Sequence, residues 1–374
     1  MAGAERRILV TGARAPAALH LARLLDAAGH HVVMADNLGR TVSAVSRACR
    51  AFVQLPAANG DPDAYSAALH QAIAAHQIDL VIPSCEEVIH LAVLWARQDM
   101  PVPLYAPAAP LLQDMHHKFS FAITLQRLGL PVPETVLLQS ADDVASVRKT
   151  ARDLVFKPVW SRFATNVLIR PRRLTIMPTE AVPWVAQEYV SGDEISVYAF
   201  AHAGRVAGLA AYQSTYRASK GAGIAFVPVD DPAVAAFVAR FVQATGWTGQ
   251  VSFDLMRRAD GTVVALECNP RSTSGVHLFR DPARFAPAFL GQGAVAPDVT
   301  GLQAVKAAMW LYGPMQRPLA VWRDLWRAQD VMAWPGDPAP ARRQTASLCE
   351  VAGIAMRERV SLNDAATFGI TWDG

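Results

Sequence analysis

Apolar and polar positions alternate in two different ways along the first hundred residues. Short apolar runs have the length of buried strands, while the stretches between them repeat apolar positions every three or four residues, as in amphipathic helices. In chain order these elements are expected at 7–12, 17–28, 31–36, 62–76, 79–83 and 86–97. Buried strands that alternate with helices predict an α/β lobe with a parallel sheet covered on both faces.

Proline-rich residues 100–110 separate this lobe from the rest of the chain. A helix is expected at 114–128, then short strands and helices to about 190 and a mixed segment to about 270. We therefore expect four parts, at 1–110, 111–190, 191–300 and 301–374. The last part holds five of the nine tryptophans. Trp322 and Trp326 are one helical turn apart, which favours packing in a core.

Two β-rich runs flank Asp260-Gly261, the strongest short hairpin signal in the chain. A two-residue turn there places Asp254 opposite Glu267, with Asn269 on the same face. Facing carboxylates are destabilising unless a positive charge lies between them, and oxygen ligands favour Mg²⁺. An exposed strand face with ordinary surface acids remains the alternative.

Lysine occurs at only five positions, and two of them are structurally awkward. Lys118 follows two histidines on the helix expected at 114–128, and Lys157 ends an apolar strand. A lysine at the end of a buried strand needs a cleft or a partner for its ammonium group, and phosphate is a natural partner. The alternative is a pair of surface lysines.

Residues 184–197 are expected to form a strand, a polar turn and a second strand. An extended segment offers backbone N–H and C=O groups to an adenine edge, and an acid shortly after it can hold ribose hydroxyls.

In this order, the elements resemble the ATP-grasp superfamily over nearly the whole chain. The most specific motif is Glu267-Cys268-Asn269-Pro270-Arg271, thirteen residues after an acid. The resemblance implies an ATP-grasp fold with a flavodoxin-like first lobe, a small lid at 111–190 and a larger part at 191–300. It assigns phosphate contacts to Lys118 and Lys157, and catalysis to Arg271 and Lys157. For the nucleoside, it assigns the adenine hinge to Gln187, Glu188 and Val190 and the ribose to Glu194. The ligands of Mg²⁺ or Mn²⁺ would be Asp254, Glu267 and Asn269.

Within the superfamily, the chain looks most like bacterial amide-forming ligases whose nucleotide core is related to carbamoyl-phosphate synthase and biotin carboxylase. Residues 11–14 and 83–87 fit that group. The resemblance implies that Mg-ATP phosphorylates a carboxylate, that an amine attacks the acyl phosphate, and that ADP is released. A regulatory ATP-binding module and a biotin-carboxylase-like enzyme that uses bicarbonate are the alternatives.

Residues 160–166 depart from the family pattern, because many ATP-grasp enzymes have a glycine-rich phosphate loop there and this chain has no glycine. Substrate contacts are expected from Arg217 and Lys220, in a polar loop at 213–221, and from Ser274 and His277.

The amino-acid composition excludes some classes of binding partner. Over half of the residues are apolar, 18% are charged, and the net charge is only +3, as in a globular protein without a nucleic-acid or anionic-membrane surface. The run that begins at Gly12 lacks the GxGxxG pattern of dinucleotide-binding folds. This favours a structural role for the first lobe over a nicotinamide site. The cysteines lack CxxC spacing and no targeting run is visible, so we expect a cytoplasmic protein. The expected partners are small-molecule carboxylate and amine substrates. Both a monomer and a homodimer are compatible with the sequence.

Overall fold

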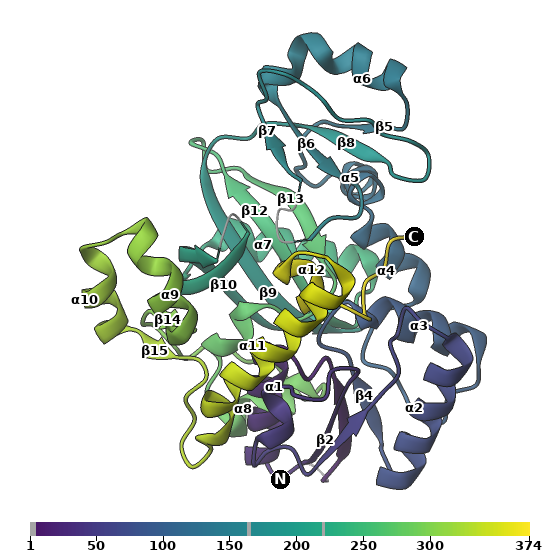
Figure 1. Ribbon diagram of the computed structural model, residues 1–374, viewed down its shortest axis with the longest axis vertical. Coiled ribbons are helices and arrows are strands. Elements are labelled where there is room, and N and C mark those ends of the chain that lie inside the picture. Colours follow the sequence, from purple (N-terminus) through teal and green to yellow (C-terminus); the bar gives the residue numbers. More distant parts are fainter. Residues whose placement is uncertain (1–4, 163–165, 219–220) are drawn as a thin grey trace.

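The computed structural model describes residues 5–162, 166–218 and 221–374, with only the backbone at residue 222 (Figure 1). The first lobe has the expected parallel sheet, in the order β3-β2-β1-β4. Its elements are β1 (Arg7–Thr11), α1 (Pro16–Ala27), β2 (His31–Asp36), β3 (Ala51–Gln54), α2 (Pro62–His76), β4 (Leu80–Ile82) and α3 (Glu87–Arg97). Apolar residues of α1 pack on one face of the sheet, and those of α2 and α3 pack on the other.

The prediction of a single helix at 114–128 is wrong, because the chain forms two helices there. These are α4 (Ala109–His116) and α5 (Lys118–Arg127). His117 between them is extended, with φ −76° and ψ 108°, and its Nδ1 accepts a hydrogen bond from the Ser120 N–H at 3.1 Å. The ring thus caps α5, and Lys118 becomes the first residue of that helix.

The small sheet stands at the top of Figure 1 and has the order β5-β8-β6-β7. Its strands are β5 (Thr135–Leu138), β6 (Leu154–Pro158), β7 (Leu168–Ile169) and β8 (Trp184–Glu188), with α6 (Ala141–Val147) and the 3₁₀ helix η2 (Arg148–Asp153) between β5 and β6. Leu138, Val144 and Phe156 belong to a separate hydrophobic cluster of this lobe. The small sheet therefore has its own hydrophobic core.

The large sheet has seven strands in the described residues, in the order β13-β12-β9-β10-β11-β14-β15. They are β9 (Asp193–His202), β10 (Arg205–Ala218), β11 (Ala222–Val229), β12 (Gly249–Arg257), β13 (Val263–Asn269), β14 (Gln303–Ala304) and β15 (Gln329–Asp330). α7 (Pro232–Thr245) packs on one face, and the 3₁₀ helix η3 (Ser274–Leu278) and α8 (Pro282–Phe289) pack on the face toward α1. The loop expected at 213–221 is largely wrong, since β10 continues to Ala218.

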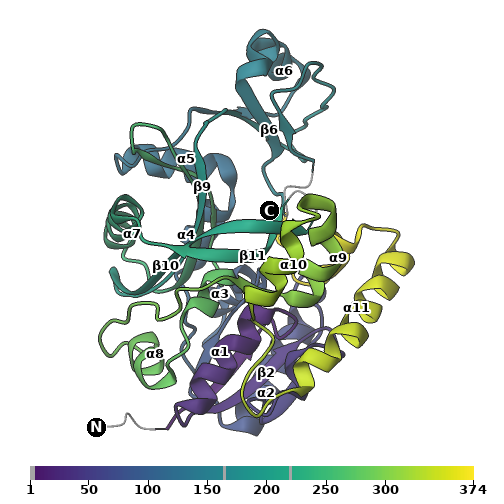
Figure 2. The same ribbon diagram turned by 90° about the vertical axis from the view of Figure 1, so that its left-hand side faces the viewer.

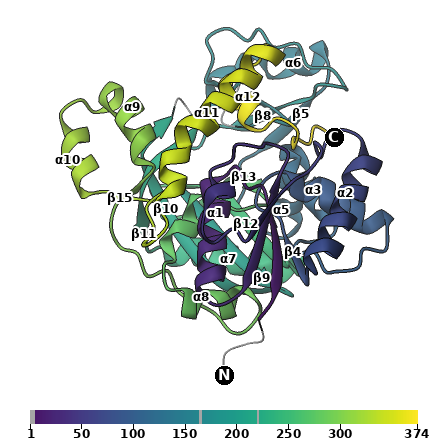
Figure 3. The ribbon, with the colours of Figure 1, turned by 60° about the horizontal axis from the view of Figure 1, so that its bottom comes forward.

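After α8 the chain adds β14 and β15 to the far edge of this sheet and then returns to the first lobe. α9 (Lys306–Gln316) and α10 (Ala320–Arg327) form a pair that projects from the body (Figure 3). α11 (Ala339–Glu358) runs back beside the first lobe (Figure 2), and α12 (Leu362–Ala366) follows it (Figure 1). No helix in the described parts of the chain is long and apolar enough to cross a membrane.

The core packing expected for Trp322 and Trp326 is wrong, because these side chains are 56% and 85% exposed. α10 docks through Val321, which is fully buried. At about 100° per residue, Trp322 and Trp326 lie about 100° and 140° around the helix from Val321 and so point away from the docked side.

Candidate active site

The hairpin of β12 and β13 brings the two predicted carboxylates together. Asp254 pairs with Glu267, and Ser252 pairs with Asn269, so the expected register at the acids is confirmed. The expected two-residue turn is wrong, because the Arg258 N–H donates to the Thr262 carbonyl at 2.9 Å and three residues lie between them. An irregularity next to Asp254 shifts the register by one residue and restores the pairing of the acids.

These two acids carry opposite shifts in pKa. Burial and the facing Glu267 raise the pKa of Asp254 to about 7, although the Ser196 hydroxyl donates to its Oδ1 at 2.8 Å. Burial also acts to raise the pKa of Glu267, but the charges of Lys118 and Lys157 outweigh it and hold that pKa below its ordinary value. The pair therefore shares its negative charge unevenly.

Both predicted phosphate lysines are buried beside this pair, each with a side chain about 6% exposed. Lys118 Nζ donates to the carbonyls of Ser161 at 2.9 Å and Val159 at 3.3 Å, and lies 3.8 Å from Glu267 Oε2. Lys157 Nζ donates to the Leu266 carbonyl at 3.2 Å. Burial lowers the pKa of Lys157 and brings that of Lys118 to about 8.

Arg271 closes the same group from the end of β13. Its Nη2 donates to Asn269 Oδ1 at 3.1 Å, and the amide of Asn269 lies 3.4 Å from Asp254 Oδ2. The structure therefore brings together Lys118, Lys157, Asp254, Glu267, Asn269 and Arg271. Two acids, an amide and three cations in one place are suited to a doubly charged cation and a polyanion.

The hinge residues lie at the end of β8, between the small and the large sheet. Gln187 and Val190 are 3% and 5% exposed, and Gln187 Nε2 donates to Thr135 Oγ1 at 3.2 Å. Glu188 is half-buried and accepts from Arg258 Nη2 at 2.9 Å. Since the side chains of Gln187 and Val190 are committed to the interior, a base at this hinge would meet the backbone.

Two residues predicted for different ligands contact each other instead. Arg217 Nη2, on β10, lies 2.7 Å from Glu194 Oε1, on β9. Both side chains are partly exposed at 29% and 43%, so this ion pair is weak and can open. Lys220, which was predicted beside Arg217, lies outside the described residues.

The prediction for His277 is not supported by its position. His277 is 3% exposed and packs against His20, with ring centroids 4.7 Å apart. Burial lowers its pKa well below the ordinary value, so it is a neutral core side chain between η3 and α1. Ser274 starts η3 and is half-buried.

The interpretation of the sequence missed a second polar group, centred on Glu86. Its carboxylate accepts hydrogen bonds from Arg162 and from the Trp372 N–H, the latter at 2.8 Å, and lies 3.1 Å from His116 Nε2. Burial alone would raise the pKa of Glu86, but His116 and Arg162 hold it well below its ordinary value. The only sequence signal was the pair of acids in residues 83–87.

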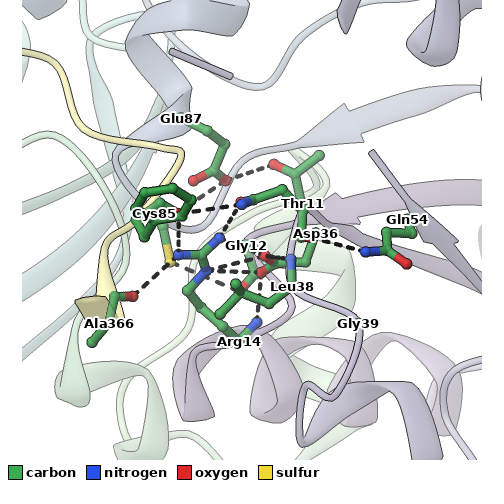
Figure 4. A network of polar contacts seen from close by, with 12 residues as sticks. Thr11, Gly12, Arg14, Asp36, Leu38, Gly39, Gln54, Cys85, Glu87 and Ala366 are labelled. Atoms are coloured by element: carbon green, nitrogen blue, oxygen red, sulfur yellow. Dashed lines mark hydrogen bonds and ion pairs between the residues drawn. The ribbon is translucent and has the colours of Figure 1, made fainter. Parts of the chain in front are cut away.

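Figure 4 shows the polar network at the carboxyl ends of β1 and β2 in the first lobe. The Arg14 guanidinium forms an ion pair with Asp36, 2.6 Å from its Oδ1, and donates to the Ala366 carbonyl at 3.1 Å. Thr11 donates to Glu87 at 2.6 Å. These contacts join the carboxyl ends of β1 and β2 to the segment that follows α11.

Known proteins give a consistent comparison. Residues 115–275 match the family described as ATP-grasp domain. The chain is similar to N5-carboxyaminoimidazole synthetase from Staphylococcus aureus, with 14% identity, a TM-score of 0.60 and coverage of 79% of this chain and 80% of that one. No curated protein sequence matched the chain significantly.

Two further solved structures have a similar fold. One is an L-amino acid ligase from Bacillus licheniformis, with 17% identity, a TM-score of 0.55 and coverage of 73% of this chain and 68% of that one. The other is the biotin carboxylase domain of Hydrogenobacter thermophilus 2-oxoglutarate carboxylase, with 12% identity, a TM-score of 0.59 and coverage of 79% and 73%.

The match covers α5, the small sheet, the β12–β13 hairpin and the start of η3, and the matched range contains every residue of the site around Asp254 and Glu267. Residues 115–275 of the chain therefore form an ATP-grasp domain.

Proposed function

We propose that this protein is an ATP-dependent ligase that phosphorylates a carboxylate and joins the acyl group to an amine, releasing ADP and phosphate. One observation carries the proposal. Two facing carboxylates, Asp254 and Glu267, lie beside two buried lysines that have no direct carboxylate partner closer than 3.8 Å in the described residues. Such lysines are costly to bury unless an anion joins them.

The residues present fit a magnesium ion bound together with phosphate. Asp254, Glu267 and Asn269 offer only oxygen ligands on one strand pair. Among the described residues, no group of three or more His, Cys, Asp or Glu side chains could hold a metal without help. Mg²⁺ characteristically takes one or two carboxylates and completes its shell with substrate phosphates and water.

Each residue has a defined part in this proposal. Lys118 and Lys157 hold the nucleotide phosphates between the small and the large sheet, and Arg271 stabilises the acyl phosphate. Bound Mg²⁺ supplies charge neutralisation on the transferred phosphoryl group. Gln187, Glu188 and Val190 line the adenine with backbone groups, and Glu194 holds the ribose once its ion pair with Arg217 opens. Arg217 is then free to hold a substrate carboxylate.

The similar proteins support the reaction class. One is named as an L-amino acid ligase, and the biotin carboxylase domain was solved with MgADP and bicarbonate. Because of the second structure, an enzyme that uses bicarbonate as its acid substrate remains the first alternative. The second alternative is a regulatory module that binds the nucleotide without turning it over.

The test is ADP release from Mg-ATP with pooled carboxylates and pooled amines, supplied separately and together. The proposal expects ADP only with both pools and none from Glu267→Gln, whose folding is checked by its melting curve. ADP release with bicarbonate as the sole acid favours the carboxylase. Magnesium-dependent ATP binding without ADP from any combination favours the regulatory module, and absence of ATP binding contradicts all three.

A further inference from the structure

A short segment far along the chain lies in a slot that is lined by charged and polar side chains. The slot is formed by Glu86 and His90 of the first lobe and by Arg162 after β6. Residues 371–373 occupy it. Glu86 is 4% exposed and the Arg162 side chain is 15% exposed, so both charges are largely removed from water. Arg162 and Glu86 form an ion pair with each other, and groups of residues 372 and 373 complete their hydrogen bonding.

The contacts of Trp372 define what the slot recognises. The Trp372 N–H donates to Glu86 Oε1 at 2.8 Å, and its carbonyl accepts from Arg162 Nη2 at 2.7 Å. The two groups belong to one residue and are separated by a single Cα, which is the spacing of the amino and carboxylate groups in an α-amino acid. A free α-amino acid would present an ammonium group to Glu86 and a carboxylate to Arg162, and both hydrogen bonds would become charge-assisted.

Other contacts of residues 371–373 also resemble those of a bound α-amino acid. Asp373 Oδ1 accepts from both Nη1 and Nη2 of Arg162 at 3.0 Å, so Arg162 already holds a carboxylate. The Trp372 ring packs edge-on against His90, with centroids 4.9 Å apart, and against the apolar cluster of the large sheet. His90 Nε2 also lies 2.9 Å from the Thr371 carbonyl. The slot therefore has a place for an apolar or aromatic side chain.

The slot adjoins the phosphate site. The Ser161 carbonyl, one residue before Arg162, accepts from Lys118 Nζ at 2.9 Å. A ligand held by Arg162 is thus connected through two consecutive residues to the lysine proposed to contact ATP. This position suits a substrate of the ligase reaction rather than a distant effector.

We propose that this slot binds an α-amino acid substrate through Glu86 and Arg162, and that residues 371–373 occupy the slot until the amino acid displaces them. The inference rests on the proposed ligase function for its role in turnover, but the binding itself can be measured without turnover. Because the segment is tethered, it competes at the high effective concentration of an intramolecular ligand. The apparent affinity for the amino acid is therefore lowered by the fraction of molecules in which the slot is filled.

The experiment compares the full chain with the double variant Trp372→Ala/Asp373→Ala. The twenty common L-amino acids are screened singly by thermal shift, and the best binder is titrated by calorimetry into both proteins. We expect at least tenfold tighter binding to the double variant. The N-acetyl and amide derivatives of the same amino acid, which lack one charge each, should bind at least tenfold more weakly than the parent. Trp326→Ser, at a side chain that is 85% exposed on α10 and outside the slot, is the matched control and should bind like the wild type.

Equal or weaker binding to a folded double variant overturns the proposal, as does equal binding of the blocked derivatives or no binding of any amino acid. If the double variant is not folded, Asp373→Asn removes only the charge that Arg162 holds, and it should still tighten binding about threefold. Adding Glu267→Gln to the double variant separates this inference from the ligase proposal, since it should abolish ADP release and leave amino-acid binding unchanged. Binding with the expected pattern but no ADP from any protein contradicts the ligase function alone.

Discussion

Asp254→Asn should stabilise the metal-free protein, although it removes a residue of the proposed magnesium site. The Asp254 pKa is raised from 3.8 to about 7 by burial and by the facing Glu267. A shift of one unit corresponds to about 1.4 kcal/mol, so ionising this side chain costs up to about 4 kcal/mol. The side chain is only partly shielded from solvent, so we expect a gain of about 2–4 kcal/mol at pH 8.

The sign is set by the raised pKa. Between about pH 4 and pH 7, the unfolded chain has lost the Asp254 proton while the folded chain retains it, so wild-type stability falls as the pH rises. The advantage of the variant should therefore grow from about 1 kcal/mol at pH 5 to its full value at pH 8. Asparagine keeps the acceptor for the Ser196 hydroxyl and can donate its amide to Glu267, so the geometry is retained.

The assay is urea unfolding with EDTA at pH 5 and pH 8. Asp193→Asn, an exposed acid at the start of β9, is the matched control and should change stability by less than about 0.5 kcal/mol. Adding Mg²⁺ should raise the urea midpoint of the wild type and leave that of Asp254→Asn unchanged. A destabilised variant at pH 8, or a gain that is the same at both pH values, would refute the reasoning.

Four further substitutions test other parts of the structure. Lys157→Met should lower ADP release by about 10²–10³-fold with little change in the urea midpoint, and activity within tenfold of wild type contradicts its role. Glu86→Gln should lower the free energy of unfolding, measured with urea, by about 2–4 kcal/mol at pH 6 and by less at pH 3. The lowered pKa of Glu86 stabilises the fold above the ordinary pKa of 4.5, and this stabilisation is lost on acidification. The same difference at both pH values argues against the ion pairs. Trp247→Ala should cost about 3–5 kcal/mol and Trp326→Ser less than about 0.5 kcal/mol by the same assay, since their side chains are 0% and 85% exposed, and equal costs contradict the packing described.

Much of the local structure could be predicted because it depends on neighbouring residues. Periodicity located the strands and helices of the first lobe, and α2 has the expected bounds. The pairing of Asp254 with Glu267 was also accessible, although by an inexact route. The three-residue turn and the register shift beside Asp254 cancel each other, and the pattern of apolar positions records only the sum of the two.

Other features had no local signal. The break at His117 depends on a side chain that caps the next helix, and histidine is not among the preferred capping residues. The ion pair of Glu194 and Arg217 depends on the pairing of β9 with β10, and each residue alone looked suited to a ligand. The exposure of Trp326 depends on which face of α10 docks, which a spacing of one helical turn leaves undecided.

The sequence by itself determined the order of elements, the ATP-grasp motif on β13 and the identity of the residues around the proposed metal site. Only the tertiary structure decided which distant groups contact each other, as Glu86 and Trp372 do across 286 positions. The physical reason is the range of the forces involved. Backbone propensity and side-chain periodicity act over a few residues and leave a pattern in the chain, whereas contacts between lobes depend on packing that has no sequence period.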